Sequence, residues 1–290
     1  MRLIRGACSV GGALLTVVTG EEAGQASLDV SRVRQEAAMA VLETVVWKYE
    51  RVRDGQRTEL DLIGAIHLAD RAYYEALNLR FRAYDAVFYE LVAGASTLRA
   101  ITQRAPQPQA SPATGINQIY AHYQSALRLA LQNEHLDYRP ANMIHADMTR
   151  EVFEQALQEA GEDVLSSAGL VPARALAQID QGILMRSLVT GDSVRLKHEV
   201  MAALVSMNAS LHSAGETSVT IHARNAVALE ILEQGILQDA TLHQVALFYG
   251  GSHLPDLHQR LVAAGWRRTA MEWLPAWTVP LPLGAHVVRH

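Results

Sequence analysis

Two short motifs place a histidine three residues after a glycine, one in each half of the chain. They are Gly64-Ala-Ile-His67 and Gly250-Gly-Ser-His253, and each follows an apolar run typical of a buried strand. A glycine lets the backbone pass closely at such a turn, because it has no side chain and tolerates unusual dihedral angles. One motif of this kind is weak, but two at matching positions predict that His67 and His253 serve one site.

Two charged residues extend this candidate site. Glu90 ends the apolar run Asp85-Ala-Val-Phe-Tyr-Glu90-Leu, and Arg224 stands just before a predicted helix. The arginine could pair with Glu90 or stabilise a developing oxyanion. Two neutral imidazoles and a carboxylate suit a divalent metal ion, which would supply a hydroxide nucleophile. Without a metal, His67 or His253 could act as a general base with Glu90 orienting it, and the residues alone leave both versions open.

The elements around the motifs predict how they are positioned. Residues 59–91 have the pattern strand, helix, strand, with Asp70 as the helix cap and an apolar helix face formed by Tyr73, Leu77, Phe81 and Tyr84. Residues 226–273 repeat this outline after a helix at 226–234, with strands at 244–249 and 266–273 and a helix at about 257–264. In an open α/β layer, reacting groups collect at the carboxyl ends of parallel strands, so one sheet built from both halves would bring His67 and His253 together.

The remaining segments complete the predicted fold. Residues 31–42 have the composition of a short helix, and residues 43–52 alternate as a strand that Asp54-Gly55 turns back antiparallel onto the strand before His67. Residues 94–115 resemble a loop or linker, residues 117–132 a helix, and Thr149 a cap for a helix to about Ala160. We therefore expect an α/β (α+β) fold, with a mixed central sheet from two pseudo-repeated halves and a helical insertion at about 93–215.

Composition narrows the class of partner. The 290 residues carry a formal net charge of −5 and no block of like charge, so we expect no nucleic-acid partner.

Residues 1–26 combine Arg2 and Arg5, the apolar stretch 7–18 and the small-residue segment Ala23-Gly-Gln-Ala26, as a secretory signal peptide does. The apolar stretch is too short to span a bilayer, and the alternative to a signal peptide is a buried first strand or helix. We expect residues 27–290 to form one exported domain, periplasmic or extracellular. The sequence leaves its oligomeric state open.

Together these motifs resemble the TraB/PrgY/Tiki family, which is related more distantly to erythromycin esterases and ChaN-like haem-binding proteins. The resemblance covers roughly residues 44–92 and 220–274, and it rests on both glycine–histidine motifs, the segment around Glu90, Arg224-Asn225 and Phe248-Tyr-Gly-Gly-Ser-His-Leu-Pro255. The segment 138–147 is similar to one in bacterial members of the family and has no assigned role.

The resemblance implies a function as well as a fold. The Tiki branch implies a metal-dependent protease using a manganese- or cobalt-type ion, with His67, Glu90 and His253 at the metal or catalytic centre and Arg224 beside it. The expected protein is a metal-dependent hydrolase acting on peptide bonds first and esters second. Four alternatives stay open: a metal-independent esterase, a haem-binding protein, a binder of another small ligand, and a regulator that binds peptides without cleaving them.

Overall fold

The structure is a computed structural model that describes residues 28–103, 121, 123–162, 179–213 and 219–281. It also describes two short strands, β1 (Ala7–Val10) and β2 (Ala13–Thr16), which pair antiparallel. The rest of the expected signal peptide at 1–26 lies outside the described residues. So do much of the predicted loop at 94–115 and the first residues of the helix predicted at 117–132.

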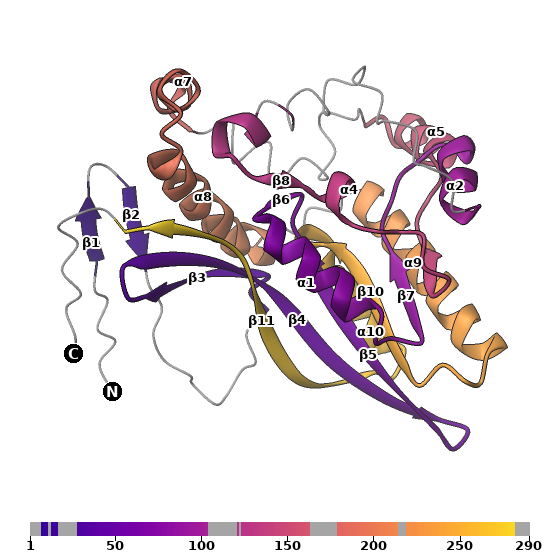
Figure 1. Ribbon diagram of the computed structural model, residues 1–290. Coiled ribbons are helices and arrows are strands. Elements are labelled where there is room, and N and C mark those ends of the chain that lie inside the picture. Colours follow the sequence, from indigo (N-terminus) through magenta and orange to yellow (C-terminus); the bar gives the residue numbers. More distant parts are fainter. Residues whose placement is uncertain are drawn as a thin grey trace.

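A seven-stranded mixed sheet forms the centre of the fold (Figure 1). Its order is β11-β4-β5-β10-β7-β9, and β3 pairs with β4 beside this path. The strands are β3 (Ser31–Glu36), β4 (Met39–Arg53), β5 (Gln56–Ala65), β7 (Ala86–Tyr89), β9 (Met143–His145), β10 (Gln244–Gly250) and β11 (Arg267–Pro280). β5, β10, β7 and β9 are mutually parallel, whereas β4 is antiparallel to its neighbours. The predicted α/β class with a mixed central sheet is thereby confirmed.

The hairpin between β4 and β5 turns at Asp54-Gly55, as predicted, and both residues have positive φ. The helix predicted at residues 31–42 is wrong, because this segment forms β3, a turn at Ala37 and the start of β4. Its three alanines and Glu36 favour a helix, but the tertiary pairing of a strand overrides such a local preference. Arg32 and Arg34 both reach across from β3 to the buried carboxylate of Glu43 on β4.

The two predicted halves are both crossover units. The first runs from β5 through α1 (Arg71–Phe81) to β7, and the second runs from β10 through α10 (Leu254–Ala263) to β11. β11 is antiparallel to β4, which is antiparallel to β5, so β11 points in the same direction as β10. The first crossover passes β10 and the second passes β5 and β4, so they travel in opposite directions along the sheet.

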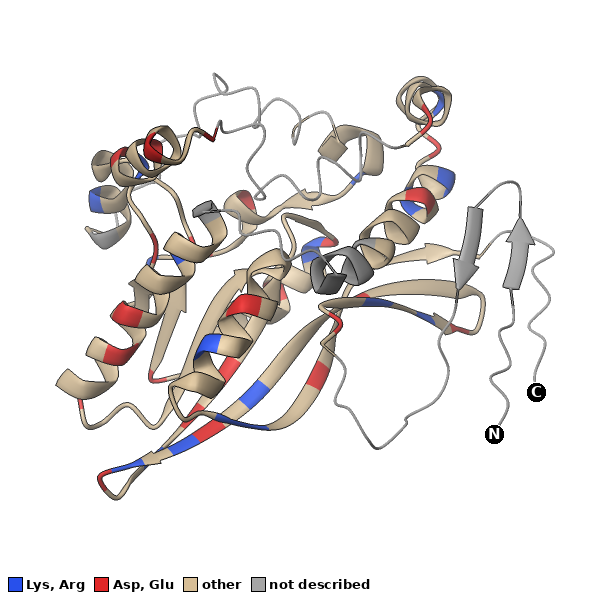
Figure 2. Ribbon diagram, turned by 180° about the vertical axis from the view of Figure 1, so that it is seen from behind, with Lys and Arg blue, Asp and Glu red and all other residues tan. Residues whose placement is uncertain are grey.

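The crossover helices consequently cover opposite faces. Tyr74 and Leu77 of α1 belong to the hydrophobic core on one face, and Leu257 and Leu261 of α10 belong to the core on the other. Figure 1 shows α1 in front of the sheet, and Figure 2 shows the opposite face with α10 and α9 (Val219–Gln238) lying across it. The connections that follow β5 and β10 therefore leave to different faces, and the ends of these strands form the switch point where ligands bind in open α/β sheets.

The middle of the chain is mainly helical but also contributes strands. Its described elements are α2 (Ala95–Thr102), β8 (Ala130–Leu131), α4 (Gln132–His135), β9, α5 (Arg150–Ala160), α7 (Gln181–Thr190) and α8 (Val194–Ser213). The predicted cap is confirmed, because the Thr149 hydroxyl accepts from the third residue of α5. β8 pairs with β6 (Leu68–Ala69), which directly follows His67. The predicted insertion at 93–215 thus supplies an edge strand to the main sheet, β9, and α2 lies in the predicted loop.

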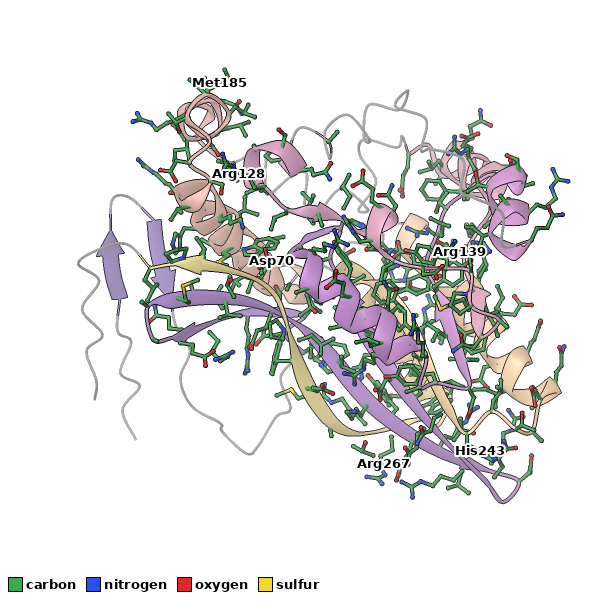
Figure 3. The ribbon with its side chains drawn as sticks, viewed as in Figure 1. Asp70, Arg128, Arg139, Met185, His243 and Arg267 are labelled. Carbon is green, nitrogen blue, oxygen red and sulfur yellow. The ribbon has the colours of Figure 1, made fainter. Side chains whose placement is uncertain are left out.

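The start of α1 is tied to β11 rather than capped by its own side chain. Asp70 occupies the predicted cap position, but its carboxylate makes no cap hydrogen bond. It accepts instead from the Thr278 amide at 3.0 Å, and it lies 3.8 Å from the ammonium of Lys197. The Asp70 amide donates to the Ala276 carbonyl, so this residue joins helix and strand (Figure 3).

Within the described chain, no helix combines the length and apolarity needed to cross a membrane.

Candidate functional site

Four parallel strands each deliver a polar group to the same edge of the sheet. His67 follows β5, Glu90 follows β7, and Asp147 lies two residues after β9. β10 ends at Gly250, and the 3₁₀ turn Gly251–His253 follows directly. β10 is paired with both β5 and β7, so the two motif histidines come from neighbouring strands, as the sequence predicts.

Glu90 is the centre of this cluster. One carboxylate oxygen accepts from Arg224 Nη2 at 2.5 Å, and the other accepts from the Gly250 amide at 2.5 Å. Burial alone would raise the pKa of Glu90, but Arg224, His253, His67 and the Gly250 amide outweigh it and hold the pKa at about 2. Glu90 is therefore a carboxylate at neutral pH. Its side chain is 14% exposed, so solvent reaches it.

Arg224 is fully engaged in ion pairs. Its Nε and Nη2 donate to the two oxygens of Asp147 at 2.9 and 2.7 Å, a bidentate pair, while Nη2 also bonds Glu90. Burial lowers the pKa of this guanidinium, but the two carboxylates more than reverse the effect and raise it. Burial raises the pKa of Asp147 despite the arginine. The phenyl ring of Phe153 on α5 lies 5.6 Å from the guanidinium carbon.

His253 is buried and held in one orientation. Its Nδ1 lies 2.7 Å from Asn225 Oδ1, and its Nε2 lies 3.3 Å from Arg224 Nη1 and 3.6 Å from Glu90 Oε1. Burial lowers the pKa of His253 to about 4, although the Glu90 charge acts in the opposite direction. The imidazole is therefore neutral at physiological pH.

His67 is the more accessible imidazole, because it is half-buried where His253 is 1% exposed. Its Nδ1 lies 3.2 Å from Gln132 Oε1, and its carbonyl accepts from the backbone N–H of Gln132 at 3.0 Å. The side-chain nitrogen of Gln132, Nε2, donates to the hydroxyl of buried Tyr138. The carbonyl before His67 is held by the Tyr74 hydroxyl at 2.9 Å. His67 is thus fixed from both its main chain and its ring.

The motif glycines are required by close contacts. Neither Gly64 nor Gly250 has a positive φ, so unusual dihedral angles are not the reason for them. A Cβ on Gly250 would lie 3.1 Å from Glu90 Oε2, and one on Gly64 would lie 3.2 Å from the Val45 carbonyl oxygen and 3.3 Å from a methyl carbon of Leu254. Gly250 therefore allows the Glu90 carboxylate to approach the backbone closely enough to accept its N–H.

A metal ion does not fit His67, Glu90 and His253 as they lie. Each Glu90 oxygen already accepts a short hydrogen bond, and the cationic Arg224 lies 3.3 Å from Nε2 of His253, the ring nitrogen nearest Glu90. Among the residues that the structure describes, no three His, Cys, Asp or Glu side chains gather closely enough to hold a metal. A haem ligand role for His253 meets the same obstacle, because both of its ring nitrogens are engaged.

Of the two roles predicted for Arg224, the pairing with Glu90 is confirmed. This guanidinium is 7% exposed, and its nitrogens are directed at Asp147, Glu90 and His253. It belongs to the centre, as predicted, but it neutralises carboxylates there and holds Glu90 in place.

Several residues of the cluster are not among the predicted site residues: Gln132, Tyr138, Asp147 and Asn225. The sequence around some of them contains features that point to the site. Asp147 and Tyr138 lie in the segment 138–147, and Arg224 shares a four-residue spacing with Ala228, Leu232 and Ile236, all buried on α9. A charged residue on an apolar helix stripe predicts a buried partner, here Asp147.

Comparison of the chain with protein-family models, curated proteins and solved structures found no match. The resemblance to the TraB/PrgY/Tiki family therefore remains a prediction that rests on the motifs.

Proposed function

We propose that the protein is a hydrolase of acyl bonds whose general base is a histidine, not a metal-bound hydroxide. The observation that carries this proposal is the grouping of an accessible imidazole, His67, with an ionised carboxylate, Glu90, at the switch point of the sheet. A second imidazole, His253, is neutral and buried beside Glu90.

His67 is the better candidate for the base because a substrate can reach it. His253 is 1% exposed, and its Nε2 already accepts from Arg224. Its lowered pKa of about 4 also makes it a weak base at neutral pH. In the proposal His253 keeps Arg224 and Glu90 in place, and His67 exchanges protons with the reacting groups.

The reaction is balanced as an ordinary hydrolysis. His67 accepts a proton from water, and the resulting hydroxide attacks the carbonyl carbon of the substrate. The bond from carbon to the leaving nitrogen or oxygen then breaks, and the leaving group takes the proton from the imidazolium. The negative charge of Glu90 stabilises this imidazolium. The two groups are close enough to interact, because His67 helps to lower the pKa of Glu90.

The substrate class and the location follow from the sequence. The motif resemblance makes peptide bonds the first choice and esters the second, and the features of residues 1–26 make export part of the proposal. Mass spectrometry of protein secreted from cells that make the full chain tests export, with cleavage expected close to Ala26. Secreted protein that retains residues 1–26 would contradict this part of the proposal.

The activity itself is tested with quenched-fluorescence peptide libraries and a panel of activated esters. We expect turnover by the wild-type protein and a loss of at least about a hundredfold in His67→Ala, since a positioned base contributes roughly 10² to 10⁴. The matched control is His243→Ala, because His243 is exposed at the opposite end of β10 (Figure 3). Equal loss in both variants, or full activity in His67→Ala, would refute His67 as the base.

A further inference from the structure

The two motif histidines are held by side-chain amides in closely matched ways. Gln132 donates its backbone N–H to the His67 carbonyl and places its Oε1 3.2 Å from His67 Nδ1. Asn225 donates its Nδ2 to the His253 carbonyl at 3.2 Å and places its Oδ1 2.7 Å from His253 Nδ1. Each amide residue thus binds both the main chain and the ring of its histidine.

The chemistry of an amide oxygen decides where the ring hydrogen lies. A carbonyl oxygen can only accept, so Nδ1 must donate in both pairs and must carry the hydrogen. In a neutral imidazole the other nitrogen, Nε2, then carries the lone pair. The two contacts therefore select the same tautomer at His67 and at His253.

The orientation of the Asn225 amide is itself fixed by its neighbours. Its Nδ2 donates to Asp256 Oδ2 at 2.7 Å, and a carboxylate oxygen can only accept. Asp256 is paired with Arg260 at 2.6 Å and lies 2.9 Å from His222. With its nitrogen directed at Asp256, Asn225 must turn its oxygen toward His253.

On the other side of the site, Gln132 contacts a hydroxyl rather than a carboxylate. It is buried, and its Nε2 lies 3.0 Å from the hydroxyl of Tyr138, whose ring packs 4.7 Å from that of Tyr89 on β7. Burial raises the pKa of Tyr138, so its hydroxyl remains protonated and cannot act as an anion. The segment 138–147, which has no role from sequence, thereby acquires one: Tyr138 supports Gln132, and Asp147 supports Arg224.

We propose that Gln132 and Asn225 are positioning residues that fix both histidines as Nδ1–H tautomers, with Nε2 as the nitrogen that accepts protons or hydrogen bonds at the site. For His67 this inference deepens the proposed function, on which its catalytic meaning rests. Neither amide needs to contact the substrate. Each acts through its histidine.

The tautomers can be read without any substrate. Long-range proton–nitrogen correlation spectra of protein labelled with ¹⁵N-histidine distinguish a ring protonated at Nδ1 from one protonated at Nε2. We expect Nδ1–H forms for His67 and His253 in the wild-type protein near neutral pH, assigned with His67→Ala and His253→Ala. An Nε2–H form of either ring would overturn the inference for that residue.

Variants of Gln132 separate positioning from simple packing. Gln132→Met removes the acceptor at similar length, and we expect it to release the His67 tautomer and to lower kcat by about tenfold or more, because a wrong tautomer impairs base catalysis. Gln132→Glu keeps an oxygen acceptor and should retain the Nδ1–H form and recover most of kcat. The control is Gln56→Met at the opposite end of β5, which removes a half-buried side-chain amide that bonds the Ala240 carbonyl. An unchanged tautomer and kcat in Gln132→Met would refute the role of Gln132.

The two proposals fail in distinguishable ways. If both rings are Nδ1–H but no peptide or ester is turned over, the hydrolase proposal fails while the positioning role stands. If turnover depends on His67 while its ring is Nε2–H, the positioning role fails while the hydrolase stands.

Discussion

The burial of His253 predicts a specific loss of stability in acid. Its pKa falls from an ordinary 6.5 to about 4 in the folded protein, because burial disfavours the imidazolium. Since the folded pKa is the lower one, the unfolded chain binds the proton first as the pH falls. The free energy of unfolding contributed by this group is complete above pH 6.5 and is lost progressively down to about pH 4.

The size of this effect follows from the shift. Each pH unit inside the window is worth about 1.4 kcal/mol. Lowering the pH from 7 to 4.5 crosses about two such units and should remove roughly 2 to 3 kcal/mol of unfolding free energy through His253 alone. Glu90, whose pKa is lowered from 4.5 to about 2, acts with the same sign in the window below.

The assay is urea unfolding at pH 7 and pH 4.5, followed by tryptophan fluorescence, for wild-type protein and His253→Asn. The variant cannot titrate at this position, so its loss of unfolding free energy between the two pH values should be smaller by roughly 2 to 3 kcal/mol. His243→Asn, an exposed control, should keep the wild-type loss. Equal pH dependence in wild-type and His253→Asn would refute the account of a buried, neutral His253.

Three further substitutions test the site and its supports. Gly250→Ala places a Cβ 3.1 Å from Glu90 Oε2, so we expect hydrolysis to fall by about tenfold or more, as a misplaced group causes, and unchanged turnover would contradict this. Arg224→Met leaves two buried carboxylates unpaired and should cost about 3–5 kcal/mol of unfolding free energy, partly restored by adding Asp147→Asn, whereas a loss below about 1 kcal/mol would count against the buried ion pair. Thr149→Ala removes the cap of α5 and should cost about 1 kcal/mol in urea unfolding without changing turnover, and loss of activity would show that the cap does more than support a helix.

The parts of the fold that were predicted correctly have strong local patterns. The apolar helix face at Tyr73, Leu77 and Phe81, the continuous apolar strand before Glu90 and the Asp54-Gly55 turn each specify one element. Recurrence of a glycine and a histidine after two buried strands was enough to place both histidines at one edge of the sheet.

The errors arose where local preference and tertiary pairing disagree. Residues 31–42 have a composition compatible with a helix, yet strand pairing and the ion pairs of Glu43 with Arg32 and Arg34 select a hairpin. β9 has only three residues, too few for a periodicity, and its place at the sheet edge depends on its partner β7.

The chemistry of the site was predicted less completely than its location. The residue types His67, Glu90 and His253 permit either a metal or acid–base chemistry, and the choice depends on what occupies their polar atoms. Arg224 and the Gly250 amide occupy Glu90, which only the folded arrangement of α9 and β10 reveals. Gln132 and Asn225 lack a sequence signature of their own, because any buried amide has the same composition.

The most direct test of the central claim is turnover by metal-free protein. Wild-type enzyme is dialysed against a strong chelator until elemental analysis finds far less than one metal ion per chain, and hydrolysis of its best peptide or ester substrate is then measured alongside His67→Ala. A histidine base at Glu90's edge of the sheet predicts undiminished turnover in the metal-free wild type and its loss in the variant. Activity that disappears with the metal and returns in proportion to added manganese or cobalt would contradict it.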